Sequence, residues 1–271
     1  MKKFKRRSAR VNLSHFRVLS ARYFRQIFTN LATLLPLILE APVMILILSI
    51  VCNADAFETH SLTQANTTIF VLVVMAGMMG ILNSYREICK EREILSREVF
   101  GGLDVSAYAL SKFIVLSAIG IVQCALLFFG SLPVTGFRFS DPAAGYALCF
   151  LAMALTDISV TAVGLYISAL LKKSESAILP VLLIIIMLVV FSDSVITLDG
   201  AAGWLRYITP SAWGIAVFGR MCGLNGWTEY FNKDFYGYHP LIPLAALAAI
   251  ALLFLFLTIA RLKRTYRQKD Q

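Results

Sequence analysis

Six long apolar runs follow one another along the chain, and they decide its class. A helix needs about 20 mostly apolar residues to cross the hydrocarbon core of a bilayer. Helices are required because each unpaired backbone polar group in lipid costs several kcal/mol. The runs cover residues 33–52, 68–84, 108–132, 144–171, 177–196 and 241–260. The pattern therefore predicts an all-α membrane protein in which residues 33–260 form a domain of six transmembrane helices.

An amphipathic pattern precedes the first run. One half of a helical wheel over residues 13–31 is apolar and aromatic, whereas Arg22 and Arg25 fall opposite. The apolar set comprises Leu13, Phe16, Leu19, Tyr23, Phe24, Ile27, Phe28 and Leu31. A basic helix with such a face lies in the membrane interface. Residues 1–32 are thus predicted to form a basic arm and an elbow helix, retained because no apolar signal-peptide core follows the first basic residues.

The connection between the second and third runs, residues 85–102, has the most organised charge pattern. Ile88, Leu95 and Val99 align on one side of a helix, and charged residues occupy the opposite arc. Gly101-Gly102 then ends the helix. A solvated surface would explain the charge alone. The position between two spans favours a cytoplasmic coupling helix that docks another protein.

The largest outer element, residues 197–239, lies between the fifth and sixth runs and holds all three tryptophans. Trp and Tyr favour the membrane–water boundary. Thr209-Pro210 is typical of a helix start. The helix that follows, at about residues 211–221, is too polar and too short to span the bilayer. We expect a re-entrant or interfacial helix over the outer mouth.

Composition and charge add orientation to this picture. Of the 271 residues, 58% are hydrophobic and 15% charged, with a mean hydropathy of +0.74. If both termini are cytoplasmic, 21 of the 25 Lys and Arg residues fall on the cytoplasmic side, including a basic tail at residues 261–271. This asymmetry is the positive-inside signature of a multi-pass protein of the cell membrane, typical of a bacterial plasma membrane. It also explains the net charge of +9 without nucleic acid, for which no binding motif is present.

No pattern in the chain predicts catalysis or metal binding. His15, His60 and His239 are far apart, and the five cysteines lack zinc-ligand spacing. No Gly-x-x-x-x-Gly-Lys-[Ser/Thr] phosphate loop is present, so we expect no cofactor in this chain. If the protein uses ATP and Mg, a partner chain must bind them. Cys52 and Cys222 fall on the same predicted side, either as a disulfide or as two free thiols.

Two acids lie within predicted spans, Glu40 in the first and Asp157 in the fourth. A charge in mid-bilayer costs at least about 2.5–3.5 kcal/mol, so such residues usually face a cavity or a partner. Glu40 either reaches the cytoplasmic interface or faces such a cavity. Asp157 lies deeper in its span. Its role is that of a proton or cation site, of an interhelical hydrogen-bond partner or of a protonated structural acid.

Four stretches, in order, resemble ABC-2-type permeases of the branch like the eukaryotic G-subfamily ABC exporters. The most specific covers residues 83–94, Asn-Ser-Tyr-Arg-Glu-Ile-Cys-Lys-Glu-Arg-Glu-Ile, and is similar to the connection between the second and third spans of that branch. The others are Leu39-Glu-Ala-Pro, Gly164-Leu-Tyr-Ile-Ser-Ala and Thr209-Pro-Ser-Ala-Trp.

The resemblance implies a transmembrane half that dimerises with a second permease protomer, identical or different. It also implies two ABC ATPase subunits and export of a hydrophobic or amphipathic substrate. The coupling residues would be Arg86, Glu87, Glu91, Arg92, Glu93, Arg97 and Glu98. The substrate path between two protomers would involve Phe70, Met75, Met79, Asp157 and Phe191.

The chain departs from that branch in three places. Glu40 replaces an expected Gln, Asp157 replaces a small or apolar residue, and the fifth run ends in Phe191-Ser-Asp-Ser. The extra acids favour a cationic substrate. The ATPase is expected on a separate chain, so the protein itself would not be an enzyme. Two other functions remain open, an ion- or proton-coupled transporter that uses Asp157 and Glu40, and a non-transporting membrane scaffold or immunity protein.

Overall fold

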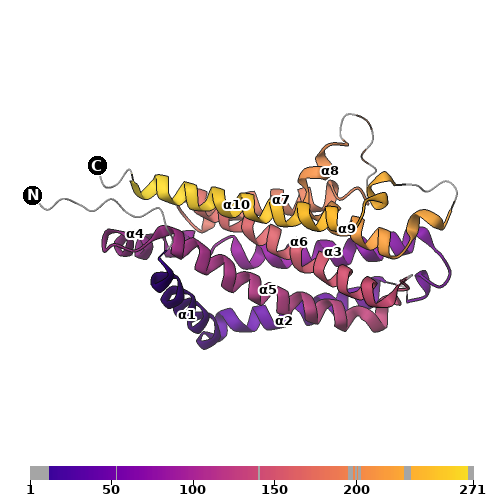
Figure 1. Ribbon diagram of the computed structural model, residues 1–271. Coiled ribbons are helices and arrows are strands. Elements are labelled where there is room, and N and C mark those ends of the chain that lie inside the picture. The colour runs from indigo at the N-terminus through magenta and orange to yellow at the C-terminus, as the bar shows by residue number, and fades with distance from the viewer. Residues whose placement is uncertain are drawn as a thin grey trace, which may run out of the picture.

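The computed structural model describes residues 12–52, 54–139, 141–194, 198, 200, 203–228 and 233–267. Every regular element in these residues is helical, and the long helices lie side by side in one elongated bundle (Figure 1). The α-helices are α1 (Leu13–Thr29), α2 (Leu31–Val51), α3 (Leu62–Ser84), α4 (Arg92–Phe100), α5 (Val105–Thr135), α6 (Pro142–Leu170), α7 (Ile178–Val190), α8 (Leu205–Ile208), α9 (Pro210–Met221) and α10 (Leu241–Arg267). The all-α class predicted from the sequence is confirmed.

Five helical stretches in the described chain are long and apolar enough to cross a membrane. They are Leu31–Val51, Leu62–Phe100, Val105–Thr135, Pro142–Leu170 and Leu241–Tyr266. The run predicted at 177–196 forms α7, which has only 13 residues. It ends because Ser192 Oγ turns back to donate to the Val189 carbonyl at 2.7 Å, and Asp193 adopts a φ of +57°. Positions 195 and 196 of this run lie outside the described residues.

α3 and α10 extend the furthest past one end of their predicted runs. α3 begins at Leu62, within a polar stretch, because Asn66 of that stretch finds partners inside the protein. Its amide donates to the Ser194 carbonyl at 3.2 Å and accepts from Tyr236 Oη at 2.9 Å. α10 continues as a helix to Arg267, through most of the predicted tail, and Tyr266 Oη donates to the Arg92 carbonyl at 3.4 Å.

The connection after α3 is a broken helix rather than the single one expected. α3 stops at Ser84, a 3-10 turn covers Cys89–Glu91, and α4 follows. The break is stabilised by Ser168 on α6, whose Oγ accepts hydrogen bonds from the backbone N–H groups of Ile88 and Cys89 at 3.0 Å each. The apolar face of this connection is buried as predicted, and Gly102, with a φ of +102°, follows the end of α4.

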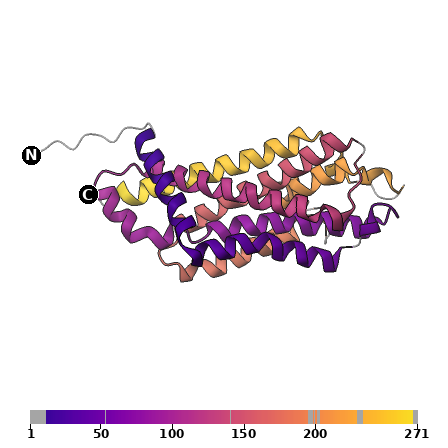
Figure 2. The same ribbon diagram turned by 90° about the horizontal axis from the view of Figure 1, so that it is seen from below.

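α1 covers most of the range in which a helix was expected before the first run, and it lies obliquely across the end of the bundle (Figures 1 and 2). Asn12 begins it, since its side chain accepts from the Ser14 and His15 N–H groups. The apolar half of the wheel divides in two. Leu19, Tyr23 and Ile27 are buried against the protein, whereas the stacked pair Phe24 and Phe28 stays about half exposed, 51% and 48%.

α9 starts at Pro210, as the sequence predicted, and is buried among α3, α6 and α10 at the end of the bundle opposite α4. The hydroxyl of Ser211 holds it to α7 by donating to the Leu188 carbonyl at 2.6 Å. Close contact is possible because Gly214 faces Thr156, with only 2.5 Å from an added Cβ to Oγ1. α9 is therefore part of the bundle core rather than a loose cover.

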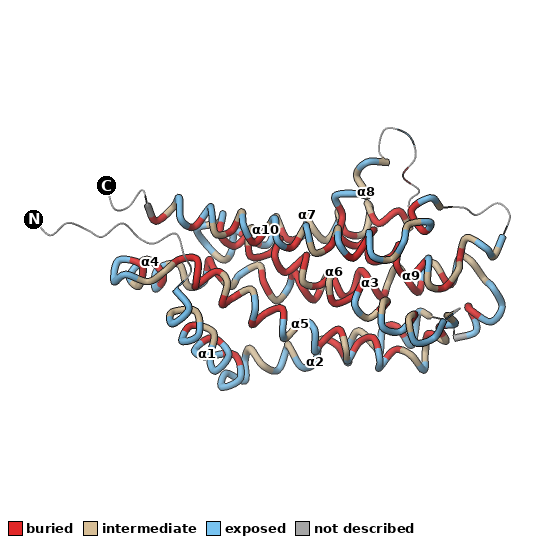
Figure 3. Tube along the Cα trace, viewed as in Figure 1, coloured by how far each residue is buried: buried red, intermediate tan, exposed pale blue. Residues whose placement is uncertain are grey.

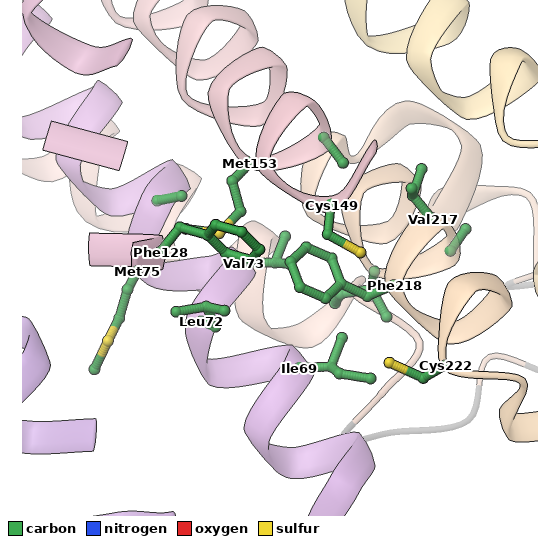
Figure 4. Close-up of a cluster of buried hydrophobic side chains, with 14 of the residues drawn as sticks. Ile69, Leu72, Val73, Met75, Phe128, Cys149, Met153, Val217, Phe218 and Cys222 are labelled. Atoms are coloured by element: carbon green, nitrogen blue, oxygen red, sulfur yellow. The ribbon is translucent and has the colours of Figure 1, made fainter. Parts of the chain in front are cut away.

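The main hydrophobic core joins α3, α5, α6 and α9. Phe128 and Phe218 meet edge to face with ring centroids 6.2 Å apart, surrounded by Ile69, Leu72 and Val73 (Figure 4). Cys149 and Cys222 lie in the same cluster as free thiols, and Cys52 is also free, so the disulfide alternative is not what the structure contains.

The outer surface of the bundle is strongly apolar. Buried positions gather in the middle of the bundle (Figure 3), and large side chains on α2 and α7 face outward. On α2, Leu35, Ile38 and Leu46 are each more than half exposed, and on α7 Leu179 is 69% exposed. A water-soluble monomer rarely exposes apolar patches of this size. The helices and this surface indicate a multi-pass membrane protein.

Asp157 of α6 is fully buried between two glycines, Gly80 of α3 and Gly120 of α5. A Cβ added at Gly120 would lie 1.9 Å from Asp157 Oδ2, and one at Gly80 would lie 2.5 Å from the Asp157 carbonyl. The two glycines therefore make the space that the carboxyl group occupies.

This arrangement predicts that Gly120→Ala destabilises the protein by about 1–3 kcal/mol, because the methyl group and the carboxyl group cannot share the space. Thermal unfolding of the purified chain in detergent measures the effect. Gly77→Ala is the matched control, since its added Cβ has its nearest neighbour at 3.4 Å. Asp157→Ala in the same chain should restore much of the loss. A Gly120→Ala protein as stable as the Gly77→Ala protein would contradict the prediction.

Candidate functional site

A buried charge cluster joins α5 to the connection after α3. Lys112 of α5 is 2% exposed. Its Nζ lies 2.8 Å from Glu91 Oε1 and 3.4 Å from Glu87 Oε2. Tyr108, one turn earlier on α5, donates its hydroxyl to Glu91 Oε2 at 2.9 Å. The connection is thus held to the first turns of α5 by charged hydrogen bonds away from solvent.

α1 covers the same cluster from the other side. Tyr23 donates its hydroxyl to Glu87, and its ring lies 3.5 Å from the Lys112 ammonium, a cation–π contact. Burial first, and then the Glu87 carboxylate, raise the pKa of Tyr23 well above its usual 10.0, so the phenol keeps its proton and remains a donor. Gln26 adds a hydrogen bond to Glu91 Oε1 at 3.4 Å.

Together with the partly exposed Lys90 beside it, the cluster is balanced in charge. Lys90 also contacts Glu87, so two ammonium groups face two carboxylates. Removing charges from water costs several kcal/mol per ion, which only close pairing and full hydrogen bonding offset. Deleting one member leaves another buried and uncompensated. We call Tyr23, Glu87, Glu91, Tyr108 and Lys112 the buried cluster.

Further contacts tie α1 to α4 and to the start of α5, and tie α4 to the end of α6. Arg22 meets Glu98 with both guanidinium nitrogens, at 2.6 and 3.2 Å. Asp104, which caps α5 by accepting from Ser106 N at 3.0 Å, also accepts from Asn12 N at 2.9 Å. On the other side, Arg92 donates to the Leu171 carbonyl. α1, α4 and the start of α5 therefore form one connected unit.

The comparisons with known proteins agree with this architecture. A family model described as ABC-2 type transporter matches residues 14–219. The chain belongs to the ABC-2 type transporter family. A relative, an ABC transporter ATP-binding/permease protein of Mycobacterium tuberculosis (strain ATCC 25618 / H37Rv), is 30% identical over 157 residues. The match covers 54% of this chain and only 18% of that relative.

In this ABC-2 chain the seven residues predicted for coupling divide into two groups. Glu87, Glu91, Arg92 and Glu98 are partly buried and are engaged by the contacts above. Arg86, Glu93 and Arg97 are exposed. The second group is the more accessible to another protein.

The exposed side of α4 also carries two apolar residues that the sequence reasoning missed. Ile94 is 55% exposed and Phe100 is 84% exposed. With Glu93 and Arg97 they follow helical spacing along one side, and we call these four residues the α4 strip. The sequence did contain a signal for them. Ile94 and Phe100 are apolar residues of a polar segment, and they fall outside its Ile88–Leu95–Val99 face. Lys112 was missed in the same way, although a lysine inside a predicted span is itself unusual.

The residues predicted for a substrate path lie in several places. Met75 and Met79 are buried in the main core, and Phe70 is partly buried against it. Phe191 follows the end of α7, and Asp157 is enclosed between its glycines. Their role between two protomers stays a prediction. Among the described residues, no group of three or more His, Cys, Asp or Glu side chains is arranged to hold a metal ion.

Lys112→Met is expected to lower the free energy of unfolding by about 3–5 kcal/mol, because Glu87 and Glu91 lose their buried counter-ion. Lys90→Met is the matched control. Its ammonium contacts the same Glu87, but its side chain is 33% exposed, so the loss should stay below about 1 kcal/mol. Thermal unfolding in detergent measures both. Adding Glu91→Gln to Lys112→Met should recover part of the stability. Equal losses for the two lysine variants would contradict the role of the buried cluster.

Proposed function

We propose that this chain is the permease subunit of an ATP-driven exporter that moves a hydrophobic or amphipathic substrate out of the cytoplasm or the inner leaflet. ATP and Mg would bind to a separate nucleotide-binding subunit, and a second permease protomer would complete the path. The observation that carries the proposal is the α4 strip. An exposed face with charged and apolar residues, fixed to the membrane helices behind it, is suited to docking a protein that moves.

The orientation follows from charge. The end of the bundle that holds α1, α4 and the last turn of α10 carries most of the 25 basic residues, so we place it and both termini in the cytoplasm. With both termini on one side the number of crossings is even. α7 would then be the fifth of six spans, despite its 13 residues. α1 would lie in the inner interface, with Phe24 and Phe28 toward lipid.

Coupling would pass through the buried cluster. A displacement of α4 by a protein bound to the α4 strip would be transmitted through Glu87 and Glu91 to Lys112, and so to the whole length of α5. Tyr23 and Arg22 would carry the same displacement to α1 and, through the short link at Asn30, to α2. Packed cores shift between discrete arrangements rather than deform smoothly, so a small displacement of α4 can move several helices together.

Co-expression with a candidate ABC ATPase subunit tests this proposal. Phe100→Ala and Arg97→Glu should each reduce recovery of the ATPase with the tagged chain about tenfold or more, because both remove contacts at the centre of the docking face. The unfolding temperature of the chain should not change, since both side chains are exposed. Arg138→Glu, exposed at the opposite end of the bundle, is the control. Normal ATPase recovery with both α4 variants would refute the docking assignment.

A second candidate is ion- or proton-coupled transport. It is favoured by Asp157, both of whose carboxyl oxygens are buried without a hydrogen-bond partner among the described residues. Such a group in a native structure calls for an explanation, and a proton site is one. Proteoliposomes that contain the chain and a proton gradient, without ATP, should then transport substrate, and Asp157→Asn should abolish it. Transport that requires the ATPase and ATP would exclude this candidate.

A further inference from the structure

A long groove runs along one side of α2, between α1 and the end of α3. Its volume is about 650 Å³. It extends along α2 from Ala32 to Met44, about 18 Å at the rise of an α-helix. The walls are mostly apolar, from Ile27, Leu37, Val43, Met44, Leu82 and Leu116. The groove can therefore hold a hydrophobic body of drug-like size.

The carboxylate of Glu40 lines this apolar groove partway along its length. Glu40 belongs to α2, and its Oε2 accepts a hydrogen bond from Gln123 Nε2 of α5 at 3.0 Å. Gln123 is itself fixed, because its Nε2 also donates to the Leu37 carbonyl at 2.9 Å and its Oε1 accepts from Asn83 at 2.8 Å. Glu40 thus has a defined position, held by neutral amides.

The charges of the groove are unevenly matched. Glu87, Lys90 and Arg86 also line it. Lys90 and Lys112 already neutralise the Glu87 carboxylate, and Arg86 lies over the Tyr85 ring at 4.8 Å. Within the described part of the chain, no basic side chain forms an ion pair with Glu40. A carboxylate in apolar surroundings with only neutral partners is costly, and a cation supplied by a ligand would relieve that cost.

We propose that this groove binds a hydrophobic organic cation, with the positive group at Glu40 and the apolar body along α2. The site lies within one protomer and opens beside α1, where a ligand could enter from the surrounding lipid. The proposal names the substrate class of the exporter and in that respect rests on the proposed function. Binding itself requires only this chain. An anionic lipid is the less suitable occupant, because its acyl chain would have to lie against Glu40.

The matched ions tetraphenylphosphonium and tetraphenylborate test the sign of the charge, since they share shape and hydrophobicity. The full chain is placed in nanodiscs of phosphatidylcholine, and binding of each radiolabelled ion is measured against empty nanodiscs. Tetraphenylphosphonium should bind saturably, and tetraphenylborate should not bind above the empty-disc level.

Three variants locate the site. Glu40→Gln keeps the shape and should weaken tetraphenylphosphonium binding about tenfold or more, the cost of losing a charged partner. Val43→Trp keeps Glu40 but fills the groove, because Val43 is 51% exposed and lines it, and should abolish binding. Glu58→Gln removes an exposed acid at the opposite end and should change nothing.

Three results would overturn the proposal. One is unaltered tetraphenylphosphonium affinity in Glu40→Gln or in Val43→Trp, and the latter decides the question if the former does not fold. Another is saturable binding of tetraphenylborate that Arg86→Gln removes, which would assign the groove to anions. Absence of saturable cation binding would equally refute it. Failure to capture an ATPase with the wild-type chain, while cation binding persists, would instead refute the exporter proposal and leave the groove assignment intact.

Discussion

Pairing of one buried lysine with two carboxylates organises one end of this molecule. Lys112 cannot stay charged in the protein interior without Glu87 and Glu91, and these acids belong to the only segment that leaves the bundle between α3 and α5. The pairing holds that segment against α5 and, together with the hydrogen bonds of Ser168 at the break after Ser84, orients α4. Tyr23 completes the enclosure, so α1 must lie across the same point. Because one face of α4 is held against the protein, the opposite face is the one that is exposed.

Much of this fold could be predicted from the sequence because the membrane imposes a simple rule on it. Long apolar runs become helices, and all but the 177–196 run reached full length. That run was overestimated because hydropathy does not register the Ser192-Asp193 turn, whose hydrogen bonds end α7 after Val190. α9 was placed correctly from Thr209-Pro210, yet its burial depended on glycines such as Gly214 that permit close approach of distant helices. Close packing between helices that are far apart in the chain produces no periodic pattern of residues in the sequence.

The candidate site shows the same limit more sharply. The charged arc of residues 86–98 was recognised as important, but a helical wheel treats all its charges as exposed. Whether Glu91 faces water or Lys112 depends on a residue 21 positions later and on α1. The sequence could therefore identify this charged segment, but it could not distinguish its buried side from its exposed side. Glu40 was noticed as an unusual acid, and only the folded chain reveals the apolar groove beside it and the amide of Gln123 that positions it.

The contact between Tyr266 and the Arg92 carbonyl has a consequence for biosynthesis. Residues 23, 87, 91, 108 and 112 all leave the ribosome early, so the buried cluster can assemble while the second half of the chain is still being translated. Tyr266 is 174 positions from Arg92 and is synthesised long after these residues. The contact between α10 and α4 therefore forms after the buried cluster can assemble, so α10 packs onto an arrangement of α1, α4 and α5 that is already fixed.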